Sequence, residues 1–160
     1  ALKKSYKNDV NVINMELSSE AIDELDLFYK NAQKEIGFSG ISPSLLKCLC
    51  TASGSHWKVC YYVVRDKVQN ELCGILVSIV HGDTATYLLG NTNAQGRRIQ
   101  ANYAMLWQAI IDAKSLGCGW YDLGGLNKNT PKGVASFKSG LNGENYQLVG
   151  ETRTLPIFSK

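Results

Sequence analysis

The chain has 160 residues, 44% of them hydrophobic, and this length suits one compact domain that buries roughly 70% of its unfolded surface. The net charge of +3, with Lys and Arg clustered only near residues 3–7 and 97–98, is too small to indicate a nucleic-acid-binding protein by charge alone. Five cysteines without a CxxC pair, no signal peptide pattern and no apolar run of about 18 residues predict a cytoplasmic protein with reduced, mostly buried thiols rather than a secreted or membrane-spanning one.

The first half of the chain predicts two helices followed by an antiparallel meander. Apolar residues recur at helical spacing over residues 20–36, behind Ser18 or Ser19 as the N-cap. A second, shorter helix is predicted to start at Ser42-Pro43, a capping residue followed by proline at the first helical position. Strand-like runs cover residues 57–65, 72–80 and 85–89, with a tight hairpin predicted at Gly82-Asp83.

The second half predicts a long amphipathic helix between short elements. The apolar stripe of this helix includes Tyr103 and Trp107, which we expect to face the core, and the helix ends near Gly117. The predicted elements are a polar loop over residues 91–98, the long helix over 99–116, a strand over 118–123, a short helix between Thr130-Pro131 and Gly140, and a closing strand over 146–149. This order is typical of an α/β domain with a mixed sheet.

A polar residue and two glycines follow the predicted strand 118–123. The carboxyl end of a sheet strand is where α/β folds place ligands, and glycine lets a substrate approach the backbone without interference from a Cβ atom. In this interpretation Asp122, Gly124 and Gly125 belong to a substrate site. The alternative is a simple turn that Asp122 caps.

Three cations are candidates for meeting a negative charge. Lys138 falls in the last turn of the predicted short helix, where it would neutralise a phosphate or a developing oxyanion, with Phe137 as an apolar wall beside it. Arg97 and Arg98 are predicted to open the long helix, whose free N–H groups attract anions. The alternative for all three is a solvated surface cation.

The motif YDLGG over residues 121–125, with Phe137-Lys138 and the glycines around that pair, resembles the second domain of Fem-type aminoacyltransferases, which build peptidoglycan cross-bridges. Residues 2–10 resemble the segment that leads into that domain, and YLLG over residues 87–90 resembles its central strand. The order of elements resembles the GNAT acyltransferase fold. The resemblance implies a mixed, mostly antiparallel sheet flanked by helices, with residues 1–160 as one GNAT-like domain and residues 1–12 as its lead-in.

The resemblance also implies a function: transfer of an aminoacyl group from charged tRNA to an amine of a cell-wall precursor, in the cytoplasm and with neither a metal nor another cofactor. It implies that Lys138 stabilises the charge of the reaction beside Phe137 and that Tyr87 lines the acceptor site. The further candidate substrate-binding residues are Asp122, Gly124, Gly125, Arg97, Arg98 and Tyr103. A lipid-linked acceptor would bring the protein to the membrane periphery.

This chain would be the C-terminal half of a two-domain protein, and the family's acidic residue that positions the attacking amine would lie in a missing N-terminal domain. A start at Ala1 rather than Met agrees with this expectation. Cell-wall members carry an arginine and a tyrosine near the loop before the second helix, where this chain reads GISPSLL over residues 40–46. The usual cation for a pyrophosphate-linked acceptor is therefore absent there, and Arg97 or Arg98 is the available substitute.

Two other functions stay open. An acyl-CoA-dependent N-acetyltransferase would cradle the CoA pyrophosphate on a loop with two small residues before the long helix, and residues 93–98 supply only Gly96. A non-catalytic substrate-binding module, completed by a partner domain, is the third possibility. An upstream domain of similar size favours the Fem-type function, whereas a free-standing chain of 160 residues favours the other two.

Overall fold

The computed structural model describes residues 2–8, 10–37, 41–52, 54, 56–128 and 130–147. The chain divides into two units, residues 1–125 and residues 126–160. The helices of the described residues are α1 (Leu2–Lys7), α2 (Ser19–Ile36), α3 (Pro43–Thr51), α4 (Ala94–Ile99), α5 (Ala101–Ser115) and, in the second unit, α6 (Lys132–Ser139). The strands are β1 (Val12–Met15), β2 (Trp57–Arg65), β3 (Leu72–His81), β4 (Thr84–Thr92) and β5 (Trp120–Asp122).

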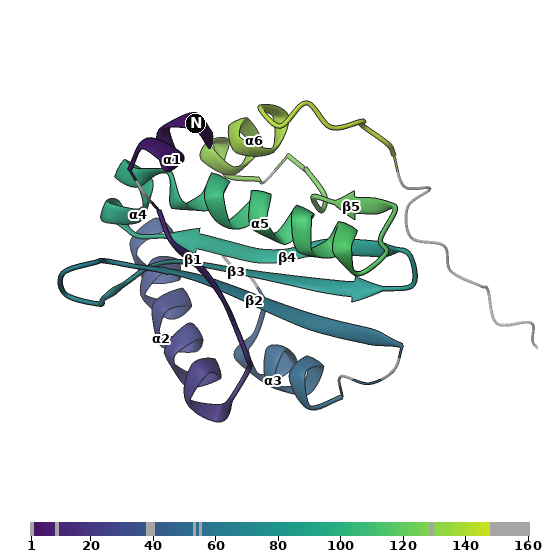
Figure 1. The fold of residues 1–160 in the computed structure, drawn as a ribbon, viewed down its shortest axis with the longest axis horizontal. Helices are drawn as coiled ribbons and strands as arrows, with labels where there is room; N and C mark the ends of the chain where they lie inside the picture. Colours follow the sequence, from purple (N-terminus) through teal and green to yellow (C-terminus); the bar gives the residue numbers. More distant parts are fainter. Residues whose placement is uncertain are drawn as a thin grey trace, which may run out of the picture. The chain divides into compact units, whose positions relative to one another are not determined.

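The first unit is built on one twisted sheet in the order β1-β2-β3-β4-β5 (Figure 1). The pairs from β1 to β4 are antiparallel, and only the pair of β4 with β5 is parallel among the described strands. A two-residue turn joins β3 to β4, and Gly82 at φ 56° supplies the left-handed conformation that this turn needs. The mixed, mostly antiparallel sheet predicted from the sequence is confirmed.

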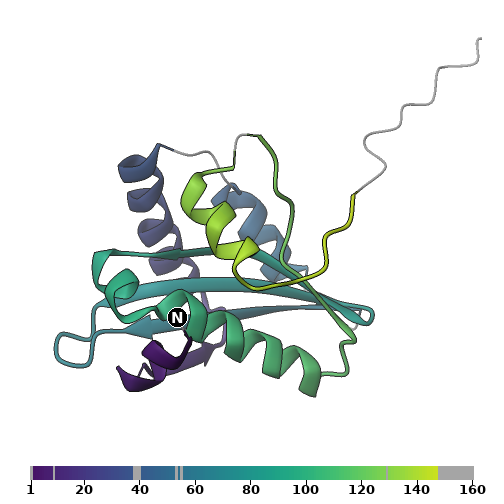
Figure 2. The ribbon, with the colours of Figure 1, turned by 90° about the horizontal axis from the view of Figure 1, so that it is seen from above.

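Helices cover both faces of the sheet (Figures 1 and 2). On one face, α2 and α3 bury Leu25 and Leu46 against side chains of β2, β3 and β4 such as Tyr61 and Ile75. On the other face, α5 contacts β2, β3 and β4, and its buried side chains include Met105 and Leu106. Apolar burial on this scale is the main favourable contribution to folding, since each fully buried Leu or Ile contributes about 1.5–3 kcal/mol.

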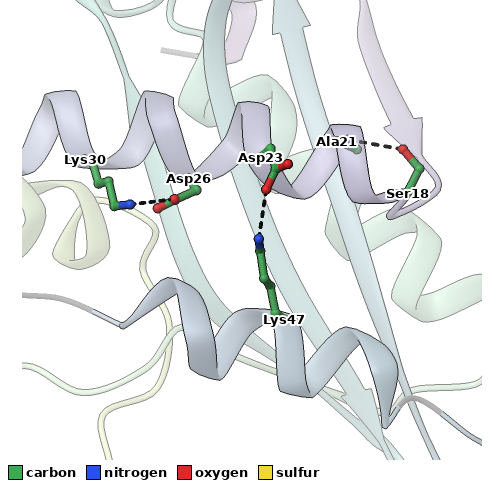
Figure 3. Close-up of polar contacts among 6 residues, drawn as sticks. All are labelled: Ser18, Ala21, Asp23, Asp26, Lys30 and Lys47. Atoms are coloured by element: carbon green, nitrogen blue, oxygen red, sulfur yellow. Dashed lines mark hydrogen bonds and ion pairs between the residues drawn. The ribbon is translucent and has the colours of Figure 1, made fainter.

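The helix α2 has a well-defined beginning and end, and Figure 3 shows its polar contacts. The Ser18 hydroxyl accepts a hydrogen bond from the Ala21 amide at 3.2 Å, which confirms Ser18 as the N-cap. Gly37 ends the helix in the left-handed conformation, at φ 71°. The ammonium of Lys47 on α3 lies 2.8 Å from a carboxylate oxygen of Asp23, so an exposed ion pair links the two helices.

Several predicted elements need correction. Two elements were not predicted: the helix α1 in the lead-in segment, and the edge strand β1, which begins at the last residue of that segment. The predicted loop over residues 91–98 is mostly structured, because β4 continues to Thr92 and α4 follows directly. The closing strand predicted at residues 146–149 is absent at residues 146–147, which are irregular, and its last two residues lie outside the described part of the chain.

Two burial predictions also differ from the structure. Trp107 was expected in the core, but it is 43% exposed, because it lies on the side of α5 opposite the buried residues of this helix. Cys60 and Cys73 are buried free thiols, as predicted, whereas the Cys48 thiol is exposed.

Candidate functional site

The two parallel strands of the sheet separate after three residue pairs. Thr84, Ala85 and Thr86 pair with residues 120–122 of β5, but β4 continues to Thr92. From Tyr87 onward, β4 therefore has β3 on one side and no strand of the described residues on the other. Backbone exposed where neighbouring strands diverge is a common ligand site in α/β proteins. The edge of β4 from Tyr87 onward, which lacks a β5 partner, together with the chain that follows Asp122, is the candidate site.

A β-bulge lies in β4 just after its last residue paired with β5. Val77 pairs with Leu89 and Ser78 pairs with Tyr87, which leaves Leu88 as an extra residue. Leu88 and Leu89 consequently both pack against the α2 core, whereas neighbouring residues of a regular strand face opposite sides. A bulge interrupts the ladder of backbone hydrogen bonds, so it adds to the backbone surface that a substrate could meet.

Hydroxyl groups from three strands gather on the α5 face of the sheet. Ser78 on β3 lies opposite Tyr87 on β4, and its Oγ lies 2.5 Å from the phenol oxygen of Tyr121 on β5. Burial raises the pKa of Tyr121 to about 12. Burial also raises the pKa of Tyr87, and the neighbouring phenols of Tyr121 and Tyr29 add to this effect. Both phenols are therefore neutral at physiological pH and can donate hydrogen bonds.

The loop after β5 is held by its own aspartate. One carboxylate oxygen of Asp122 accepts a hydrogen bond from the Gly124 amide at 2.8 Å, and Gly124 adopts φ 74°, which favours glycine. This geometry agrees with the turn that Asp122 caps. At Gly125 a Cβ atom would meet nothing within 4 Å, so space beside this backbone is available to a ligand. Contact of Asp122, Gly124 or Gly125 with a substrate stays a prediction.

Arg97 and Arg98 do not open the long helix, and this prediction is wrong. Both lie in the last turn of α4, and Gln100 at φ 64° separates α4 from α5. Arg97 donates a hydrogen bond to the Thr92 carbonyl at 2.8 Å, and Arg98 contacts the side chain of Gln95. The carboxyl end of a helix carries the negative pole of its dipole, so the helix end does not reinforce anion binding there.

Residues 93–98, the candidate loop for binding the CoA pyrophosphate, lie mostly in the helix α4. Gly96 is buried, and a Cβ atom at this position would lie 3.0 Å from the carbonyl carbon of Cys73 and closer still to its oxygen. The glycine therefore allows α4 to approach β3. This close approach accounts for a glycine at position 96, so phosphate binding is not needed to explain it.

Phe137 and Lys138 belong to the second unit. They lie near the end of α6, and the Gly140 amide closes this helix by donating to the Ser136 carbonyl at 3.0 Å. Both side chains are partly exposed. The predicted short helix is confirmed, whereas the approach of Lys138 to the residues around Asp122 stays a prediction. Tyr103 is partly exposed on α5, and its role in the site is likewise a prediction.

Sequence reasoning did not single out Ser78, Gly90 or Tyr121 as site residues. Tyr121 belongs to the YDLGG motif, and Ser78 is the one polar residue in the run CGILVSIV of β3, so both gave a weak signal. Among the described residues, no group of three His, Cys, Asp or Glu side chains could hold a metal ion. Nor does any helix of that part of the chain combine the length and apolar character needed to cross a membrane.

A comparison with protein families decides the relationship of this chain. The model of the FemAB family matches residues 63–157, which is more than half of the 160 residues. The chain belongs to the FemAB family. Its membership, together with the fold, makes this FemAB protein an acyltransferase. A search of curated protein sequences finds no significant match.

Solved structures similar to this FemAB chain have the GNAT fold. FemX has a TM-score of 0.68 at 13% identity, over 86% of this chain and 51% of its own. A protein from Pyrococcus furiosus described as an acetyl transferase has a TM-score of 0.67 at 15% identity, over 91% of this chain and 99% of its own. The aminoglycoside antibiotic 6'-N-acetyltransferase AAC(6')-Ih from Acinetobacter baumannii has a TM-score of 0.65 at 11% identity, with the same coverage. These likenesses establish the GNAT fold predicted from the sequence, and the chain spans about half the length of FemX.

Proposed function

We propose that this FemAB chain is the C-terminal, GNAT-like half of an aminoacyltransferase that moves an aminoacyl group from charged tRNA to an amine of a cell-wall precursor. The observation that carries the proposal is the family match over residues 63–157. The coverage of half of FemX supports a second domain of similar size in the whole protein. Because charged tRNA is a cytoplasmic donor, we place the reaction in the cytoplasm, at the membrane periphery if the acceptor is lipid-linked.

The chemistry would be attack of a neutral amine on the ester carbonyl of the donor, through a tetrahedral oxyanion, with the tRNA hydroxyl as the leaving group. The protein would contribute orientation and electrostatic stabilisation, and the proposal needs no metal or other cofactor. Lys138 would balance the oxyanion, with Phe137 as an apolar wall beside it. The divergence of β4 from β5 supports a substrate site at Tyr87, where the neutral phenol would hydrogen-bond to the acceptor.

An acetyl-CoA-dependent N-acetyltransferase is the second candidate function. Its support is the 99% coverage of an aminoglycoside N-acetyltransferase, a protein of about the same length as this chain. The packing of Gly96 against Cys73 is evidence against this second function, because Gly96 is the glycine that would have to bind the CoA pyrophosphate. A non-catalytic binding module, completed by another domain, remains a third outcome of the test.

The test uses the intact parent chain with a tRNA pool charged with labelled amino acids, cytosolic and envelope precursors as acceptors, and acetyl-CoA as the alternative donor. We expect label to move from tRNA, and Lys138→Ala to raise the barrier by about 2–4 kcal/mol, the effect of removing one oxyanion donor. Lys132→Ala, at an exposed position of the same helix, is the matched control and should retain the parental rate.

Each outcome separates the candidates. A loss below about threefold in Lys138→Ala would remove this lysine from the mechanism. Transfer only from acetyl-CoA would replace the proposed function by the second candidate. No transfer from either donor would favour the binding module.

A further inference from the structure

Tyr87 and Gly90 of β4 lie on the same face of the sheet, although they are three residues apart. In a regular strand an odd spacing places two residues on opposite faces, but the extra residue Leu88 changes the alternation between them. A Cβ atom at Gly90 would lie 2.9 Å from Cζ and 3.2 Å from Cε2 of Tyr87, and closer still to the hydroxyl oxygen. The tip of the phenol ring therefore occupies the space that any side chain at position 90 would need.

The backbone of Gly90 gives no other reason for a glycine. The described glycines in the left-handed region are Gly37, Gly82, Gly117 and Gly124, so Gly90 has a conformation that other residues adopt readily. Gly90 is also exposed, so a side chain there would not have to enter the core. The three atoms nearest to a Cβ atom at this position would all belong to Tyr87. The absence of a side chain at position 90 therefore leaves room for the phenol of Tyr87.

We propose that Gly90 is a positioning residue, which seats the phenol of Tyr87 across β4 at the point where β4 and β5 diverge and so aims its hydroxyl at the bound acceptor. This inference rests on the proposed function, because it assigns Gly90 to the acceptor side of the same site. The bulge at Leu88 supplies the geometry, and the absence of a side chain supplies the room. A larger residue at position 90 would rotate the ring away from this orientation.

The first arm of the test needs no activity. The full chain is labelled with tyrosine carrying 13C at Cζ, and the Tyr87 resonance is identified by its loss in Tyr87→Phe. Gly90→Ala should shift this resonance, whereas Gly119→Ala should leave it in place, because a Cβ atom at Gly119 meets nothing within 4 Å. An unchanged Tyr87 resonance in Gly90→Ala would show that Gly90 does not position the phenol.

The second arm measures transfer to the acceptor. Gly90→Ala should lower kcat/KM for the acceptor by about tenfold or more, since a displacement of about 1 Å can cost 100-fold, and should leave the KM for charged tRNA unchanged. In a Tyr87→Phe background, the same substitution should cost less than about threefold, because the group it misplaces has been removed. Fully additive losses would overturn the positioning role.

Folding and activity are kept apart by a further variant. If Gly90→Ala lowers the thermal midpoint, it should lower it much less in a Tyr87→Leu background, measured against Tyr87→Leu alone, because the ring that clashes is absent. An equal loss in the two backgrounds would count against the proposed role of Gly90. If the parent chain transfers nothing from charged tRNA, the proposed function fails, while the resonance of Tyr87 still decides whether Gly90 seats the phenol.

Discussion

Gly96 illustrates how one missing side chain fixes the position of a helix. The α4 backbone at Gly96 lies against the Cys73 carbonyl and the Thr92 side chain. The neighbouring Asn93 strengthens this contact, because its backbone amide donates to the Cys73 carbonyl at 3.1 Å and its side chain to the Leu72 carbonyl at 3.0 Å. Since the obstacle is backbone of a central strand, it cannot move aside as a flexible side chain can.

We expect Gly96→Ala to lower the free energy of unfolding by about 1–3 kcal/mol, the usual cost of overpacking. Urea unfolding followed by circular dichroism measures the change. Gly119→Ala serves as the control at an open position and should stay within about 0.5 kcal/mol of the parent. A Gly96→Ala chain as stable as this control would show that α4 can shift away from β3.

At the scale of elements, the sequence correctly predicted the element ends and turns that neighbouring residues in the chain determine. The ends of β2, the hairpin at Gly82-Asp83 and the limits of α6 follow from strand patterning, turn residues and the proline and glycine that flank the helix. The helix α4 was missed because its six residues lack an apolar stripe, and tertiary contacts at Gly96 hold it. The bulge at Leu88 was invisible, because register depends on the neighbouring strand.

The site was predictable to a smaller extent. YDLGG located the loop after β5, and the resemblance singled out Tyr87, but neither revealed that a bulge places Tyr87 beside Gly90. The position of Arg97 and Arg98 at the start of the long helix was predicted wrongly, because start positions are the least certain part of a periodicity argument. Their contact with a substrate stays a prediction. The positions of these residues depend on their contacts in the folded chain, which the residue types alone do not reveal.

The N-cap of α2 provides a test at this scale. Ser18→Ala should destabilise the chain by about 1 kcal/mol, because it removes the acceptor for the Ala21 amide. The same hydroxyl contributes to the lowered pKa of Glu20, after the backbone hydrogen bond of that carboxylate. Ser19→Ala, at the first helical residue, is the matched control and should change the thermal midpoint little. Equal effects of the two substitutions would contradict the assignment of the cap.

For the whole molecule, buried phenols make stability depend on alkaline pH. Burial raises the pKa of Tyr61 and Tyr62 above the ordinary value, and that of Tyr121 to about 12. Above about pH 10 the unfolded chain loses phenolic protons that the folded chain keeps, so the free energy of unfolding falls as the pH rises. Below that pH the phenols are protonated in both states and their contribution is constant.

We therefore expect urea unfolding to give a constant phenolic contribution between about pH 7 and pH 9 and a steep decline from about pH 10 toward pH 12. Lys47 acts in the same direction, because its hydrogen bond to Asp23 raises its pKa. Tyr121→Phe should make the decline shallower, which isolates the phenol from the lysine. Stability that stays level up to about pH 11 would mean that these phenols ionise as freely in the folded chain as in the unfolded one.

The bulge in β4 also has a consequence for comparing relatives. Up to Tyr87 the odd-numbered residues of this strand face α5, whereas Leu89 faces α2. The bulge therefore exchanges the faces to which odd- and even-numbered residues point. Homologues that keep this reversal must preserve a spacing of three between the tyrosine and the glycine, as in YLLG over residues 87–90. A homologue that lacks one residue of this tetrapeptide would carry a regular strand, in which a tyrosine and a glycine two residues apart share a face without any bulge. The spacing Tyr-x-x-Gly is therefore the residue count that this bulge requires, and it identifies a bulge only together with the register of the neighbouring strand.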